Sequence, residues 1–288
     1  MSGHLQRAQI LMDLGRSAQA EEELRRELSE SPDNFEAHRM LALCLASQGH
    51  LPQAQTESKE AIRLQTNSDM VHYTYGWILL QQGEWGQAEM ALREAIHLDP
   101  RDARHYSMLA HLFWQQQRLE ECEKAARQGL SLDPDNADCA ISLAQALIFL
   151  HRFSEAQKIL KILMAKDPEN PRAHLVQGLL SQVQGKSDES LNHFQEAERL
   201  NSENTPLHEF VESRKATVEL QNKSEESWKR FQEAERLNPE KISPRKLVGT
   251  RKKPATWSGD FTIIEWGIIL LSIAFVAKLL FFFWEAMK

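Results

Sequence analysis

A repeat of 34 residues constrains this chain more than any other feature. Similar text returns at that spacing: LDPRD at 98–102, LDPDN at 132–136 and KDPEN at 166–170. Self-similarity at a fixed period indicates a row of equal supersecondary units, each burying its apolar face against the next. The sequence therefore predicts a repeat architecture rather than one globular core. Proline or its replacement stands at the same place in each unit: Pro32, Thr66, Pro100, Pro134, Pro168, Ser202 and, after a longer step, Pro239.

Each unit reads as two amphipathic helices, because apolar residues recur at i and i+3 or i+4 in both halves. Glycine at the fifteenth position ends the first helix, and proline at position 32 ends the second. Asn34, Asn136 and Asn170 then cap the next helix. Positions 8 and 20 hold small residues, which lets the two helices approach closely: Ala8, Ala42, Gly76, Ala110, Ala144 and Gly178; Ala20, Ala54, Ala88, Cys122, Ala156 and Ser190. No strand pattern is present, so the predicted fold class is all-α.

This pattern resembles the tetratricopeptide repeat (TPR) over residues 1–240. The resemblance rests on the small residues at positions 8 and 20, the proline at position 32 and the strict period. Position 4, usually aromatic in the family, departs from it. The resemblance implies a right-handed superhelical solenoid of about six to seven helix pairs, with the first helices lining its concave side and no enzymatic activity. Predicted units are 1–34, 35–68, 69–102, 103–136, 137–170, 171–204 and a degenerate capping unit at 205–240.

By the same resemblance, positions 2, 5, 9 and 12 of the first helices face the groove. An apolar and aromatic strip of this kind suits an extended peptide or an amphipathic helix. The alternative is that part of the strip packs between neighbouring helices. The family's carboxylate clamp is not expected, because its asparagines are replaced. The predicted groove residues are Arg39, Tyr73, Trp77, Arg104, His111, Trp114, Ile141, Gln145 and Ile148, with Leu80 beside them.

The C-terminal region departs from the repeat. Residues 241–260 predict a basic flexible linker, and the apolar run within 261–284 predicts a transmembrane helix. Its 22 residues from Ile263 to Trp284 span about 33 Å as a helix. The cluster Arg251, Lys252 and Lys253 precedes the run, so the positive-inside rule predicts a tail-anchored, single-pass protein with cytosolic repeats and its C-terminus on the far side.

One stripe of that segment offers a packing surface for a partner helix: Gly267, Leu271, Ala274 and Lys278. Snorkelling of Lys278 to the membrane surface is the simpler account. Two functions follow. The favoured one is a membrane-tethered scaffold or adaptor that binds a partner protein or peptide through its groove. The alternative is a structural or assembly subunit of a membrane protein complex, docked through its transmembrane helix.

Other classes of function are not indicated. A net charge of −7 argues against a nucleic-acid binder. No phosphate-binding, hydrolase or zinc-protease motif occurs, so neither an enzyme, a small-molecule substrate nor a cofactor is expected.

Four histidines occupy one repeat position and are interpreted as packing residues, so no metal site is predicted: His38, His72, His174 and His208. Cys44, Cys122 and Cys139 read as small core residues of a reducing compartment, and the N-terminus has no signal-peptide pattern.

Overall fold

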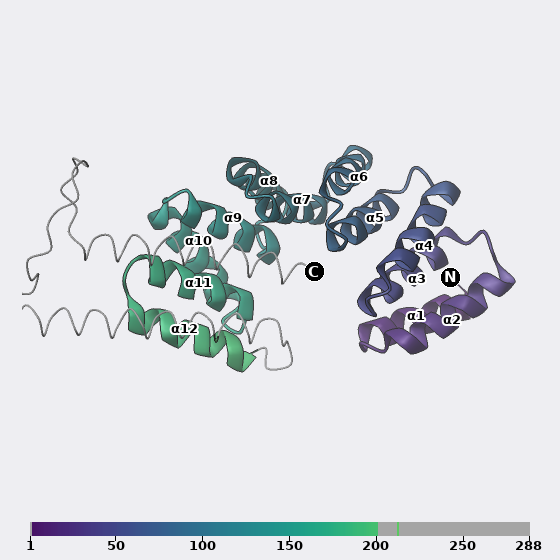
Figure 1. Ribbon diagram of the computed structural model, residues 1–288, viewed down its shortest axis with the longest axis horizontal. Helices are drawn as coiled ribbons and strands as arrows, with labels where there is room; N and C mark the ends of the chain where they lie inside the picture. The colour runs from purple at the N-terminus through teal and green to yellow at the C-terminus, as the bar shows by residue number, and fades with distance from the viewer. Residues whose placement is uncertain (1, 201–211, 213–288) are drawn as a thin grey trace, which may run out of the picture. The chain divides into compact units, whose positions relative to one another are not determined.

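The computed structural model describes residues 2–200 and Glu212. Its regular structure is entirely helical within 2–200, which confirms the all-α repeat prediction (Figure 1). The twelve helices are α1 Gly3–Asp13, α2 Ser17–Glu30, α3 Phe35–Ser47, α4 Leu51–Leu64, α5 Asp69–Gln81, α6 Trp85–Leu98, α7 Ala103–Gln115, α8 Leu119–Leu132, α9 Ala137–Phe149, α10 Phe153–Lys166, α11 Pro171–Val183 and α12 Ser187–Leu200.

The remaining predictions on domain organisation fall on other residues. Apart from Glu212, the capping unit at 205–240, the linker at 241–260 and the transmembrane segment at 261–284 lie outside the described residues. The membrane-proximal cluster Arg251–Lys253 lies there too, as does the stripe Gly267, Leu271, Ala274 and Lys278. Among the helices that are described, none combines the length and the apolar character needed to cross a bilayer.

Each odd-numbered helix forms a hairpin with the even-numbered helix that follows it. The residue two places beyond the first helix has a left-handed backbone, which reverses the chain. It is glycine in four hairpins, with φ between 71° and 81°. Gln117 and His151 take the same place in the hairpins α7–α8 and α9–α10, both at φ 58°. The turn geometry is therefore kept even where the sequence lacks glycine.

The two helices of a hairpin touch through the small residues at positions 8 and 20. The alanines at both positions are fully buried, as is Cys122. In the last described hairpin, Ser190 Oγ donates a hydrogen bond of 2.8 Å to the Gly178 carbonyl oxygen. A Cβ at Gly178 would lie 2.6 Å from Phe194 Cε1, closer than side chains pack. The structure thus confirms close helix approach as the reason for small residues here.

The junctions between units are closed by side-chain hydrogen bonds. Asn34, Asn136 and Asn170 each accept from a backbone N–H three residues ahead, as predicted for N-caps. The position-4 side chain reaches back to the carbonyl oxygen six residues earlier. These pairs confirm that the repeated histidines in the described region have structural roles: His38–Pro32 at 2.9 Å, His72–Thr66 at 2.8 Å and His174–Pro168 at 2.8 Å, with Tyr106–Pro100 at 3.1 Å matching them.

The three cysteines lie inside the stack, as predicted. Cys44, Cys122 and Cys139 are buried and free. Burial raises the pKa of Cys44 to about 11 and that of Cys122 and Cys139 to about 12. Because the thiolate is the reactive form, these side chains act as packing groups.

Candidate interaction surface

The odd-numbered helices form the inner side of the stack. Each contacts the odd-numbered helix of the next repeat, from α1–α3 through to α9–α11. The even-numbered helices mainly contact the helices adjacent to them in sequence. Helices that touch across every repeat boundary lie closer together than those that do not, so the stack curves toward the odd-numbered series. We call the solvent-facing surface of α5, α7, α9 and α11 the inner face.

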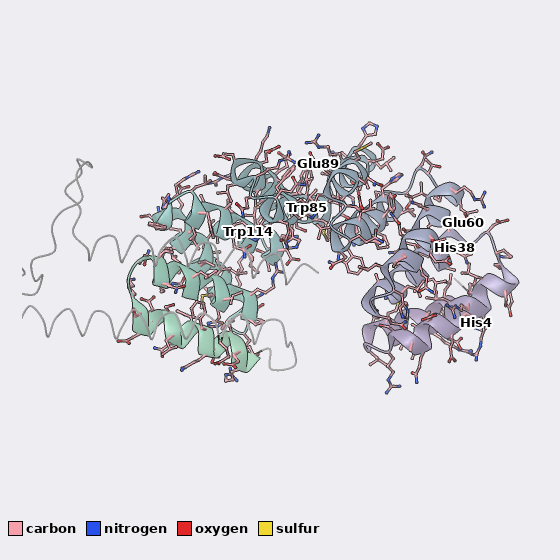
Figure 2. The ribbon with its side chains drawn as sticks, in the orientation of Figure 1. His4, His38, Glu60, Trp85, Glu89 and Trp114 are labelled. Atoms are coloured by element: carbon pink, nitrogen blue, oxygen red, sulfur yellow. The ribbon has the colours of Figure 1, made fainter. Side chains whose placement is uncertain are left out.

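An aromatic pair stands out on the inner face. Trp114, labelled in Figure 2, lies half-buried near the end of α7 and meets Phe149 of α9. Their ring centroids are 5.0 Å apart at an interplanar angle of 73°, an edge-on contact. Phe149 is 57% exposed, so about half of its side chain is open to solvent. The pair joins two successive repeats and leaves an apolar surface open to solvent.

Polar groups accompany this pair. Asp138 of α9 forms an ion pair with Arg172 of α11, across the next repeat boundary. His111 of α7 and Gln145 of α9 are half-buried. Burial, and then the positive charge of Arg172, hold the pKa of His111 below its usual value, so its ring is neutral at pH 7. A neutral imidazole both donates and accepts, so this region can hydrogen-bond a peptide backbone.

The two predicted groove arginines are each held by a carboxylate close in sequence. Arg39 donates to Glu36 through Nη2 at 2.6 Å and Nε at 2.9 Å. Arg104 donates to both carboxylate oxygens of Asp102, with Nε at 2.9 and 3.0 Å. Neither guanidinium is therefore an uncompensated cation that would select an acidic ligand.

Part of the predicted groove is core instead. Ile141 is 1% exposed and Ile148 is 4% exposed, so neither reaches a ligand, and their assignment to the groove is corrected. The physical reason is that α9 contacts α7 and α11 as well as α8 and α10, so neighbouring repeats cover most of its surface. Leu80 is buried in the same way. Tyr73 and Trp77 are half-buried, and each packs against buried apolar residues of the core.

Sequence reasoning missed three residues of the inner face. Asp138 and Arg172 occupy position 2 of their units, one of the positions expected to face the groove, and were not singled out. Phe149 occupies position 13, one place past the last of those positions. The sequence could have indicated it, because the equivalent residues Ser47, Gln81 and Gln115 are polar, although Val183 at this position of the sixth unit is apolar and also exposed. An aromatic residue at a position that elsewhere faces water is a candidate contact.

Helical hairpins stacked in register, with an aromatic and polar inner face, define a scaffold for protein–protein interaction. Two family models match the chain. One, described as Tetratricopeptide repeat, covers residues 5–65. The other, described as Cytochrome c-type biogenesis protein H TPR domain, covers residues 80–208. The chain belongs to the tetratricopeptide repeat family. No curated protein matches it.

Solved structures show the same fold. A structure from the functional characterisation of Pseudomonas aeruginosa pilF is 21% identical with a TM-score of 0.59, covering 73% of this chain and 96% of that one. The APC/C hetero-tetramer Cut9-Hcn1 is 15% identical with a TM-score of 0.64, covering 73% and 42%. A tetratricopeptide repeat protein from Parabacteroides merdae is 14% identical with a TM-score of 0.50, covering 73% and 96%. At these identities the similarity defines the fold alone.

Proposed function

We propose that this chain is a membrane-tethered TPR scaffold or adaptor that binds a partner protein or peptide through its inner face, on the cytosolic side. The observation that carries the proposal is the Trp114–Phe149 pair, an aromatic surface left open between two repeats. Large aromatic side chains dominate the energetics of protein interfaces. His111, Gln145 and the Asp138–Arg172 pair supply hydrogen-bonding groups around it.

The chemistry of the inner face supports a particular kind of partner segment. An apolar or aromatic anchor would cover Phe149, and the backbone of an extended segment would bond the neutral His111 and Gln145. Arg39 and Arg104 are both paired with carboxylates of this chain, so neither is free to bind an acidic terminus of a partner. The preferred ligand is therefore a segment with an apolar anchor and little net charge.

The membrane tether is the second part of the proposal. It rests on the sequence of residues 261–284, whose apolar run has the length of a bilayer span, and on the basic cluster Arg251–Lys253 before it. Confining the repeats to a surface raises their effective concentration toward a partner in the same membrane. Removing residues 261–288 should release the protein from sedimented membranes, while the full chain remains bound after an alkaline wash. Retention of both forms would refute the tether.

The family match suggests a more specific role. The model covering residues 80–208 is named for cytochrome c biogenesis, and these residues include the whole aromatic pair. The specific form of the proposal is that the partner takes part in cytochrome c maturation at the membrane. Loss of covalently attached haem from c-type cytochromes on deleting the gene, restored by the wild-type chain and not by Phe149→Ala, would support it. Full haem attachment without the gene would refute it.

Site-specific photocrosslinking tests the inner face directly. A photoreactive residue in place of Phe149 should capture one partner in membranes. The matched control is Met90 on α6, an apolar residue that is 74% exposed on the other series of helices. The same reagent there should capture that partner poorly. Equal capture from both positions would show that the inner face is not the binding surface.

The alternative function is a structural or assembly subunit that docks through its transmembrane helix. The stripe Gly267, Leu271, Ala274 and Lys278 favours it, since small residues beside a charge suit a helix–helix contact. Replacing the apolar run with polyleucine separates the two functions. An adaptor that needs only an anchor keeps its partner, whereas a docking helix loses its complex.

A further inference from the structure

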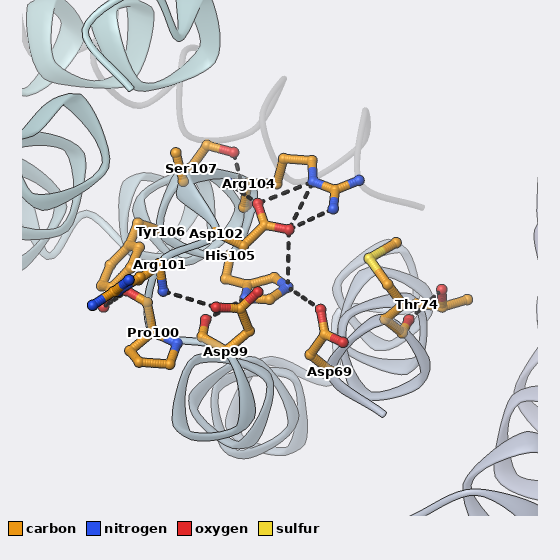
Figure 3. A network of polar contacts seen from close by, with 12 residues as sticks. Asp69, Thr74, Asp99, Pro100, Arg101, Asp102, Arg104, His105, Tyr106 and Ser107 are labelled. Atoms are coloured by element: carbon orange, nitrogen blue, oxygen red, sulfur yellow. Dashed lines mark hydrogen bonds and ion pairs between the residues drawn. The ribbon is translucent and has the colours of Figure 1, made fainter. Parts of the chain in front are cut away.

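Three side chains of metal-ligand type meet where α5 and α7 begin. Asp69 is the first residue of α5, Asp102 is the N-cap of α7, and His105 lies in the first turn of α7. His105 Nε2 lies 3.3 Å from Asp69 Oδ2 and 3.7 Å from Asp102 Oδ2 (Figure 3). One donor atom from each residue lies within 4.8 Å of the others. Two successive repeats thus contribute potential metal-ligand atoms to one site.

The orientation of the His105 ring is fixed by a backbone bond. Nδ1 lies 3.2 Å from the carbonyl oxygen of Asp99. Because that oxygen only accepts, Nδ1 carries the proton, and Nε2 of a neutral ring presents its lone pair. A hydrogen bond from one ring nitrogen to a backbone carbonyl is the arrangement that orients metal-binding histidines.

The second ring nitrogen has no hydrogen-bond partner. His105 is fully buried, and Nε2 is within ion-pair distance of Asp69 but forms no hydrogen bond. Figure 3 shows it directed at both carboxylates. A lone pair facing two carboxylates is repelled unless a positive charge lies between them. A metal ion supplies that charge, as does a second ring proton.

The stack itself does not require a histidine here. Position 3 of the second, third, fifth and sixth units holds small or apolar residues that are fully buried: Ala37, Val71, Cys139 and Ala173. Burying a polar group without a partner costs free energy. The same position is therefore filled at lower cost elsewhere in the chain, which points to a role for His105 other than packing.

The distances fit a tetrahedral ion. Bonds of about 2.0–2.2 Å from zinc to nitrogen and oxygen place neighbouring ligand atoms about 3.4 Å apart. The observed separations of 3.3 and 3.7 Å from Nε2 are close to this value. Calcium and magnesium prefer oxygen donors alone, whereas one imidazole with two carboxylates suits zinc and related divalent ions.

We propose that Asp69, Asp102 and His105 form a binding site for a divalent transition-metal ion, of which zinc fits best. The three side chains leave one tetrahedral position for water. The ion would connect α5 to α7 across a repeat boundary and so stabilise the stack. This site is separate from the aromatic pair and does not depend on the scaffold function proposed above.

Arg104 opposes metal binding. Its guanidinium bonds both oxygens of Asp102, so an ion must displace it from Oδ2 (Figure 3). The Arg104 side chain is exposed and can move into water. Replacing it with glutamine removes both the competing bond and a positive charge. Arg104→Gln should therefore bind zinc more tightly than the wild type, by about tenfold or more, which a role confined to packing would not produce.

The test is a titration of the full chain with zinc in mild detergent, in which calorimetry measures the binding affinity. All proteins carry His193→Gln, because His174 and His193 place two Nδ1 atoms 3.1 Å apart and offer a second pair of ligands. Asp69→Asn and Asp102→Asn should each weaken binding by at least about tenfold, since the loss of a group that only orients a ligand already costs that much. Asparagine remains a good N-cap at position 102, so the helix start is kept. Asp33→Asn, an exposed carboxylate of another repeat junction, is the matched control.

Cobalt provides a second readout, because a tetrahedral cobalt ion absorbs far more strongly in the visible range than an octahedral one. Intense bands in the control, lost in Asp69→Asn, would support the site even if Asp102→Asn fails to fold by circular dichroism. Equal zinc affinity in Asp69→Asn and Asp33→Asn would overturn the proposal. So would the absence of binding to the folded chain. The cluster would then be a polar contact between His105 and Asp69 within the stack.

Discussion

Replacing Gln117 with glycine should stabilise the α7–α8 hairpin. Gln117 has φ 58° at a place where four other hairpins have glycine. A left-handed backbone costs a residue with a Cβ about 1–2 kcal/mol. Glycine removes that cost but loses about 0.5–1 kcal/mol through its greater freedom in the unfolded chain. The expected net gain is about 0.5–1 kcal/mol. The side chain of Gln117 is exposed, and its backbone N–H bond to the Trp114 carbonyl, at 2.9 Å, is unaffected.

The assay is urea unfolding of the full chain in mild detergent, monitored by far-ultraviolet circular dichroism. Repeat stacks open locally, so hydrogen exchange of the α7 and α8 amides supplies a second measure of the same change. Gln117→Ala is the control, because alanine keeps the Cβ and hence the backbone cost. Stability of the alanine variant equal to that of the glycine variant would refute the backbone argument.

Three further predictions concern the interior. Gly178→Ala should destabilise the protein by about 1–3 kcal/mol, seen as a lower melting temperature, because the new Cβ would overlap Phe194; Gly86→Ala, where nothing lies within 4 Å, should not. Burial and then His174 hold the pKa of His193 below its ordinary value, so stability should be constant above about pH 6.5 and decrease as the pH falls below it, in wild type more than in His193→Gln. The three thiols should react with a disulfide reagent only on unfolding, which a thiol count with and without denaturant measures: Cys44, Cys122 and Cys139.

The fold was predictable because its requirements recur. Close helix approach needs a small residue at position 8, and both Ala42 and Gly76 meet this need. Because successive units agree at this position, the pattern is not a coincidence. The first residues of α3 and α9 could be predicted from Asn34 and Asn136 for the same reason, because asparagine caps helix N-termini in several units. Gln117 and His151 show where pattern alone falls short, since they adopt the glycine conformation without glycine.

The inner face was only partly predictable. Position numbers taken from the family assign Trp114, His111, Ile141 and Ile148 alike to the groove, yet Trp114 and His111 are half-buried whereas Ile141 and Ile148 are buried. Helical periodicity gives the direction in which a side chain leaves its own helix. It does not give how far the next repeat covers that side, which depends on the packing of α9 between α7 and α11.

The repeat itself separates residues that build the stack from residues that can serve another purpose. A position needed for stacking has similar requirements in every unit, because each unit meets its neighbour in the same way. His105 is the one polar residue at position 3 of the described units, and Phe149 is the one aromatic residue at position 13, where Val183 is also apolar and exposed. Phe149 is exposed where burial would be favourable, and His105 is buried where an apolar residue would suffice. Stacking requires neither side chain, and on this ground we propose a partner surface for Phe149 and a metal ion for His105.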